Sequence, residues 1–314
     1  MEGKRGETRH CRPPRSRIVT PRQTPVALDF DGSIGALPGL TRIALGTWQE
    51  AIRFGCRVRV MDALSTQLAA ALPREHGTVL MGSGDFHHVS WPLIERQRRR
   101  LDGKPFRVVV FDNHPDNMRF PFGVHCGSWV RRVALLPEVT HVHVVGITSA
   151  DIGAASCWEN YLAPLRRGKL TYWSVGVDTR WARWAGVARG FRSFGDVDAM
   201  IDAFDGMLGR QPEPTYLSID KDAFSTDVVR TNWDQGRLLE AHVDRVIDSL
   251  GGQIVASDIT GEVSSYVYRS RWKRWLSAAD GQDIAVSAGD LAQWQAQQHA
   301  LNARLVARIA AVSG

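Results

Sequence analysis

Short apolar runs alternate with amphipathic stretches along most of this chain. Seven runs of five to seven residues predict β-strands, at 26–30, 56–61, 78–82, 107–112, 141–147, 216–220 and 254–259. Stretches with helical spacing of apolar residues lie at 64–72, 91–100, 129–136, 196–208, 238–250 and 289–312. Near-continuous apolar strands that are separated by helices favour a parallel sheet covered on both faces. The pattern therefore predicts an α/β fold with three layers, α/β/α.

Polar segments directly follow four of these runs. TVLMG leads into GSGDFHH, RVVVFD into DNHPD, YLSID into DKD, and IVASDI into TGE. Ligands of parallel sheets bind outside the carboxyl ends of the strands, so these four segments are the places to look for chemistry.

The segment after residue 111 places Asp112, His114 and Asp116 at alternate positions. In extended backbone such residues point to the same side, so the three side chains are expected to converge where the strand ends. Asp220 and Asp222 repeat the arrangement about a hundred residues later. A single aspartate at a strand end can also cap a following helix.

Taken together, the strand ends supply four aspartates and two or three histidines. Four carboxylates in one cleft repel one another strongly unless cations neutralise them, and two divalent ions carry the matching charge. Ligands that are rich in oxygen, with few imidazoles and no thiolate, favour Mn²⁺ over Zn²⁺ or Cu²⁺.

The three motifs GSGDFHHVS, DNHPD and DKDAF resemble, in the same order, those of the arginase and agmatinase family of ureohydrolases. The resemblance implies an α/β/α fold and hydrolysis of a linear carbon–nitrogen bond in a small amidine or guanidino substrate, by a hydroxide that bridges two Mn²⁺ ions. By the family pattern, one ion would be held by His87, Asp112, Asp116 and Asp220, and the other by His114, Asp112, Asp220 and Asp222.

Three positions depart from the family pattern. The first turn has two extra residues, so either His87 or His88 can be the ligand, and His87 is favoured. The histidine that the family uses for proton transfer is replaced by Cys126, with His125 one position earlier, which makes His125 the candidate acid or base. Glu262 resembles the family glutamate that binds the guanidinium group, at a spacing one residue longer. The substrate itself is not identified by the sequence.

Other enzyme classes compete with this interpretation. VALDFDGSI resembles the first motif of haloacid-dehalogenase phosphatases, with Asp29 as nucleophile and Asp31 as acid, but the later motifs of that class are missing. A deacetylase-like hydrolase of the same fold would use a single metal ion, and would not need both Asp116 and Asp222.

The charge distribution bears on non-catalytic alternatives. The net charge is +6, but residues 1–25 hold seven Lys and Arg against two Glu, which leaves 32 against 31 in the rest. We therefore predict a disordered basic arm at 1–25 and a single catalytic domain at 26–314. Aromatic and basic residues interleave at 179–192 and 266–275, as in some nucleic-acid-binding proteins. Stems of Trp and Arg more commonly cover a core edge, so a non-catalytic nucleic-acid- or metal-binding protein is the weaker alternative.

The four cysteines show no CxxC spacing, and no apolar stretch approaches the 18 or so residues that span a bilayer. These features predict a soluble protein of the reducing cytoplasm. The amphipathic C-terminal stretch is expected to be a packing helix, and it is a possible contact in a homo-oligomer.

Overall fold

The computed structural model describes residues 24–271, 273–275 and 287–313. The predicted basic arm at 1–25 therefore lies outside the described residues, except for Thr24 and Pro25.

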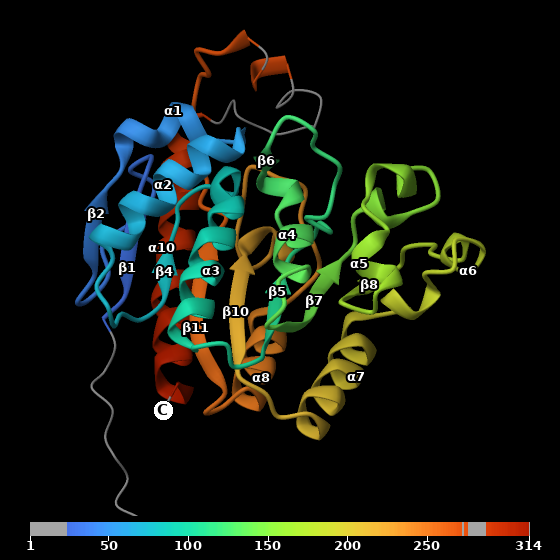
Figure 1. Cartoon of the computed structure of the whole chain (residues 1–314). Helices are drawn as coiled ribbons and strands as arrows, with labels where there is room; N and C mark the ends of the chain where they lie inside the picture. The colour runs from blue at the N-terminus through green and yellow to red at the C-terminus, as the bar shows by residue number, and fades with distance from the viewer. Residues whose placement is uncertain (1–23, 272, 276–286, 314) are drawn as a thin grey trace, which may run out of the picture.

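Among the described residues, nine parallel strands form the middle layer. They are β1 (Val26–Asp29), β2 (Thr41–Ala44), β4 (Val79–Leu80), β5 (Phe106–Phe111), β7 (Val139–Ile147), β8 (Leu170–Val175), β9 (Phe191–Phe194), β10 (Thr215–Asp220) and β11 (Ile254–Thr260). Their order in the sheet is β2-β1-β4-β11-β10-β5-β7-β8-β9, and every neighbouring pair is parallel (Figure 1). A separate antiparallel pair joins β3 (Gly55–Cys56) to β6 (Val124–His125).

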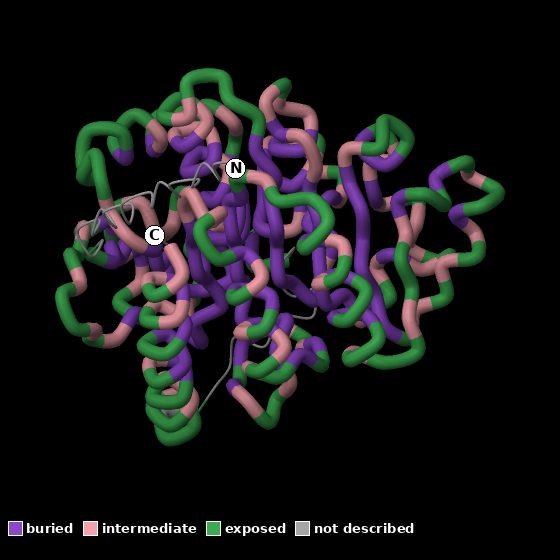
Figure 2. The backbone as a smooth tube through the Cα atoms, turned by 90° about the horizontal axis from the view of Figure 1, so that it is seen from below, coloured by how far each residue is buried: buried purple, intermediate pink, exposed green. Residues whose placement is uncertain are grey.

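Helices cover both faces of the sheet. One layer contains α2 (Val58–Ala71), α3 (Ser90–Arg100), α4 (Val130–Ala134) and α5 (Ala163–Arg166), and the other contains α7 (Val197–Arg210), α8 (Glu240–Ser249) and α10 (Ala288–Val312). Successive residues of β5 alternate between the two cores, with Val108 and Val110 in one and Val109 and Phe111 in the other. Figure 2 shows the buried segments between the more exposed outer helices. The predicted three-layer α/β/α class is confirmed.

Some predicted elements were wrong. The run at 56–61 is not a strand, because only Gly55 and Cys56 are extended and α2 begins at Val58. Met61, Leu64 and Leu68 face the core at helical spacing, and this burial outweighs the alternation of valine and arginine before them. Strands β2, β8 and β9 were not predicted from the sequence.

The direction in which successive strands are added to the sheet reverses between β5 and β10. The connection after β5 runs through α4 on one face to β7, whereas the connection after β10 runs through α8 on the other face to β11. Adjacent strands whose connections leave in opposite directions have an open crevice at their carboxyl ends. Phe111 of β5 pairs with Ile219 of β10, so Asp112 and Asp220 follow side by side at this crevice.

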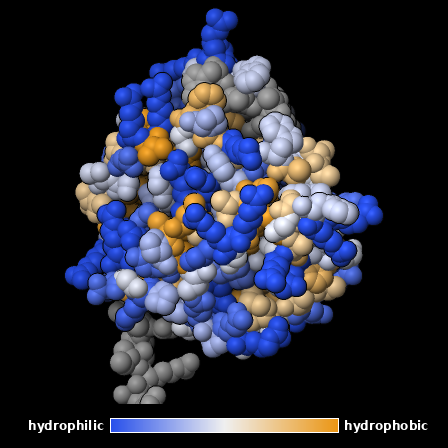
Figure 3. All heavy atoms as spheres, turned by 45° about the vertical axis from the view of Figure 1, so that its right-hand side comes forward, coloured by the Kyte–Doolittle hydropathy of each residue, from blue (hydrophilic) through white to orange (hydrophobic). Residues whose placement is uncertain are grey.

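Surface character adds little to this picture. Within the described residues, no helix is both long enough and apolar enough to cross a membrane. The face in Figure 3 is mostly hydrophilic, with apolar residues in small separate groups.

Candidate metal centre

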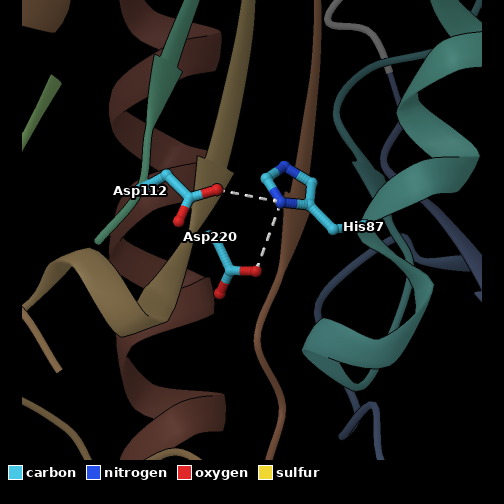
Figure 4. A group of neighbouring side chains, drawn as sticks. All are labelled: His87, Asp112 and Asp220. Atoms are coloured by element: carbon cyan, nitrogen blue, oxygen red, sulfur yellow. Dashed lines mark ion pairs between the residues drawn. The ribbon is translucent and has the colours of Figure 1, made fainter. Parts of the chain in front are cut away.

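Four predicted ligands meet beyond the ends of β5 and β10. His87 lies on the 3₁₀ turn η2 (Gly84–Val89), and its Nδ1 is 2.9 Å from Asp116 Oδ2, 3.2 Å from Asp112 Oδ2 and 3.4 Å from Asp220 Oδ2 (Figure 4 draws His87, Asp112 and Asp220). Each of these side chains is at most 6% exposed. Trp129 Nε1 also donates a hydrogen bond to Asp116 Oδ2, at 2.6 Å.

A second group forms around His114. Its Nδ1 lies 3.0 Å from Asp222 Oδ2 and 3.5 Å from Asp112 Oδ1. Asp112 thus takes part in both groups, with Oδ2 toward His87 and Oδ1 toward His114. Within the groups His87–Asp112–Asp220 and Asp112–His114–Asp222, the candidate ligand atoms all lie within 4.8 Å of one another. In the described chain Asp220 joins only the first group, and its Oδ1 accepts a hydrogen bond from the Asp222 backbone.

The outer nitrogen of each histidine has a fixed partner. His87 Nε2 lies 3.0 Å from Ser218 Oγ, whose proton goes to Asp258 Oδ1 at 2.6 Å. His114 Nε2 lies 2.7 Å from Asp234 Oδ1. Because both partners act as acceptors, each Nε2 carries a proton, and Nδ1 is the nitrogen that faces the carboxylates and would be available to an ion.

The electrostatics of the cluster are those of a site for cations. Burial raises the pKa of Asp116 and of Asp222 to about 7, and the charge of Asp112 adds to both shifts. Burial and the charge of Asp222 also raise the pKa of Asp220. Asp112 Oδ2 is buried without a hydrogen-bond partner while it faces His87. Bound divalent ions would relieve this repulsion, and a donor set of carboxylates and imidazoles fits them.

A cavity of about 550 Å³ opens onto both groups. Asp151, Glu159 and Asp234 line it in addition to the candidate ligands, and Trp233 forms part of its wall. Neither Lys nor Arg occurs among the described residues that line it. The field in this cavity therefore attracts positively charged molecules.

The structure places the alternative histidines differently. His88 is buried outside both groups, and burial lowers its pKa well below the ordinary value. His125 and Cys126 both line the cavity. Nδ1 of His125 accepts a hydrogen bond from the Gly127 backbone at 2.9 Å, and burial lowers the pKa of His125 to about 3. The imidazole of His125 is therefore uncharged near neutral pH, with its proton on Nε2.

Glu262 does not reach the cavity, in contrast to the expectation from the resemblance. Its Oε1 accepts hydrogen bonds from Lys221 Nζ at 2.6 Å and from Asn302 Nδ2, and its side chain is buried. Lys221 stands between Asp220 and Asp222, so it points away from the metal centre into the interior. A buried ammonium group needs a counterion, and Glu262 is that counterion.

The two aspartates of the motif that resembles a phosphatase are paired with arginines. Asp29 pairs with Arg42 at 2.9 Å, and Asp31 lies 3.4 Å from Arg53. Neither aspartate lines the cavity.

Several residues at the centre carry no local signal in the sequence. Ser218 and Asp258 are ordinary interior positions of β10 and β11, and Asp234 lies in an irregular segment 120 residues from its partner His114. Strand alternation hints only at Ser218, which shares a face with Asp220.

Part of the chain matches a known protein family. Residues 32–179 match the model of the arginase family. This range contains His87, Asp112, His114 and Asp116, and it ends before Asp220. An uncharacterized protein of Thermotoga maritima is 28% identical over 236 residues, which are 75% of this chain and 78% of that protein.

Solved structures are similar in fold. Proclavaminate amidino hydrolase from Streptomyces clavuligerus has a TM-score of 0.53 at 14% identity and 93% coverage of both chains. A variant of Trypanosoma cruzi formiminoglutamase with Mn²⁺ has a TM-score of 0.52 at 12% identity, over 95% of this chain and 96% of that one. Arginase from Medicago truncatula matches at 17% identity and a TM-score of 0.49, over 81% of this chain and 65% of that one.

Proposed function

This chain belongs to the arginase family, and from that membership we propose that it is a metal-dependent hydrolase that cleaves a linear carbon–nitrogen bond of an amidine or guanidino compound. The observation that carries the proposal is the position of Asp112, whose two carboxylate oxygens face two different histidines, His87 and His114. A carboxylate shared between two imidazole-containing groups suits a pair of neighbouring divalent ions.

We further propose two Mn²⁺ ions per chain. His87, Asp112, Asp116 and Asp220 would hold the first, and His114, Asp112, Asp220 and Asp222 the second. The oxygen-rich donor set supports Mn²⁺. The formiminoglutamase variant of similar fold, described with Mn²⁺, also supports it.

The proposed chemistry divides between the ions and the chain. Two divalent ions held by these residues would lower the pKa of a water molecule and would stabilise negative charge that develops during the attack on the substrate carbon. Asp151, Glu159 and Asp234 would attract and orient a cationic amidinium or guanidinium group in the cavity. His125 would hold the substrate through its Nε2 proton, since its depressed pKa makes it a weak base.

Metal analysis and product release test this function together. We expect about two Mn²⁺ per chain by mass spectrometry, and urea or ammonia from at least one member of an amidine and guanidino panel. Asp112→Asn should lose at least one ion and most of the activity. Asp29→Asn, which changes a strand-end carboxylate paired with Arg42, is the matched control and should retain both.

Other outcomes would redirect the assignment. One ion per chain with acetate release from acetylated amines would indicate the single-metal deacetylase-like alternative. Phosphatase activity that disappears in Asp29→Asn would indicate the haloacid-dehalogenase alternative. Fewer than one ion per chain and no turnover would leave a binding protein. The cytoplasmic location and the homo-oligomer stay predictions.

A further inference from the structure

The segment 231–236 approaches the second ligand group from the solvent side. Asp234 Oδ1 lies 2.7 Å from His114 Nε2, and Asp234 Oδ2 accepts a hydrogen bond from Asn113 Nδ2 at 3.0 Å. The side-chain oxygen of Asn113 accepts hydrogen bonds from the backbone and hydroxyl of Thr148, at 3.1 and 2.7 Å. These bonds fix the orientation of the Asn113 amide, so both Asp234 oxygens are held by donors on the segment that carries Asp112.

The same segment is anchored on its other side. Gly236 N donates to the carbonyl of Asp222 at 2.7 Å, and Gln235 Nε2 donates to the carbonyls of Phe224 and Val229 at 3.1 and 2.8 Å. The backbone that carries Asp234 is therefore bonded to the segment that carries Asp222, a candidate ligand of the second group. The exposed Asp234 is thus carried by a mostly buried segment that is held at a fixed distance from the ligand group.

Trp233 adds packing at this point. Its ring stacks on Phe54 with 6.5 Å between centroids, and it meets the His114 ring edge to face at 6.1 Å. The indole thereby limits how far the imidazole of His114 can rotate. Rotation is the motion that would take Nδ1 away from Asp112 and Asp222.

We propose that Asp234 is a positioning residue for the second metal ion: it holds His114 in the Nε2-protonated form with Nδ1 directed at Asp112 and Asp222. The inference rests on the proposed dimetal function. A carboxylate that accepts the outer N–H of a ligating histidine fixes its tautomer and ring orientation and makes it a stronger donor. Asp234 is outside both candidate ligand groups, so its effect passes through His114.

The two histidines are then oriented by different means. His87 is hydrogen-bonded to the hydroxyl of Ser218 inside the sheet, whereas His114 is bonded directly to the carboxylate of Asp234, whose side chain is 65% exposed. Removal of Asp234 should therefore affect the second ion and leave the first alone.

Calorimetric titration of the metal-free full-length protein with Mn²⁺ tests the inference, with metal content after gel filtration as a second readout. Wild type should bind two ions. In Asp234→Ala the affinity for one ion should fall by about 10- to 100-fold while the other is unchanged. Asp234→Asn should lie between, because its oxygen can still accept from His114 while its amide opposes the Asn113 amide. Asp151→Asn removes a carboxylate from the same cavity without touching His114, and should bind both ions like wild type.

Contrary results distinguish a failure of the positioning role of Asp234 from a failure of the dimetal function. If Asp234→Ala binds both ions as tightly as wild type, the positioning role is wrong and the dimetal function stands. Equal weakening in Asp234→Ala and Asp151→Asn would reduce the effect to general charge and also overturn it. Wild type that binds no Mn²⁺ contradicts the proposed function before any variant is measured. Circular dichroism checks that each variant is folded, and Asp234→Asn serves if the alanine variant is not.

Discussion

Lys221 and Glu262 form a buried ion pair on the side of the β10 end that faces away from the metal centre. Glu262→Gln leaves the Lys221 ammonium without its counterion, so we expect the free energy of unfolding to fall by about 3–5 kcal/mol. Turnover per folded, metal-loaded molecule should stay unchanged, because Glu262 does not line the cavity. Urea unfolding and steady-state kinetics measure the two effects.

An exposed pair provides the control for this change. Asp248→Asn removes the partner of Arg308 at the surface and should cost less than about 1 kcal/mol. If the Glu262→Gln protein has normal stability but has lost turnover, Glu262 binds the substrate, as the resemblance to the family first implied.

Gly261→Ala should weaken Mn²⁺ binding by displacing Asp220. Gly261 has a φ of +92°, and a Cβ there would lie 2.5 Å from Asp220 Oδ1 and 2.7 Å from the Lys221 nitrogen. Asp220 must move, so we expect weaker Mn²⁺ binding and a loss of stability of about 1–3 kcal/mol. Gly252→Ala is the matched control, with a φ of +73° and nothing within 4 Å, and should show the backbone cost without the metal defect. Equal Mn²⁺ affinity in the two variants would contradict this account.

His125 and Cys126 compete for one catalytic role, and their variants should differ. His125→Ala removes the Nε2 donor from the cavity, so we expect turnover to fall by about 100-fold or more with both ions still bound. Cys126→Ala should change turnover much less, because a thiol is a weak donor. The activity of each variant is measured with its metal content. A larger loss in Cys126→Ala would exchange the two assignments.

Stability of the metal-free protein should depend on pH in a defined direction. The pKa values of Asp116 and Asp222 rise to about 7 from 3.8, through burial and the charge of Asp112, so the folded state keeps protons that the unfolded state has released. This contribution is fully present below about pH 4 and is lost as the pH rises through 7, so stability should fall between pH 5 and 8. Burial lowers the pKa of His87 and His114, but neighbouring carboxylates raise both well above the ordinary value, which acts in the same direction.

Urea unfolding in the presence of a chelator at several pH values measures this trend. Added Mn²⁺ should oppose it, because ions replace protons more readily at higher pH. A metal-free protein that becomes more stable between pH 5 and 8 would show that the aspartates remain ionised in the folded state.

The sequence predicted the part of the centre that depends on strand ends. Asp112 follows the apolar run that became β5, and Asp220 ends the run that became β10. His114 and Asp222 do lie beside them, but through turns and not through the expected extended backbone: Asp112 Oδ1 accepts from His114 N, and Asp220 Oδ1 accepts from Asp222 N at the start of the 3₁₀ helix Lys221–Ala223. The choice of neighbouring strands was not visible in the sequence. It is set by the packing of both helix layers, to which residues from the whole chain contribute.

The structure differs from the expectations at several places for identifiable reasons. Glu262 was assigned by spacing, but the side it faces depends on the turn at Gly261 and on the charge of Lys221 behind the strand. Asp234 was missed because an irregular segment has no periodicity that predicts where its side chains lie. The run at 56–61 was misassigned because alternation over a few residues competes with helical burial that becomes visible only further along the chain.

The position of the shared carboxylate has a consequence for how the protein folds. Asp112 and Asp220 are separated by more than a hundred residues, and they become neighbours only when β10 has entered the sheet beside β5. Contacts of such high sequence separation form late, so the binding site for the ions does not exist in the early stages of folding. Mn²⁺ is therefore expected to slow unfolding while leaving the rate of folding nearly unchanged. The ions would stabilise the sheet after it has formed, and they would take no part in its nucleation.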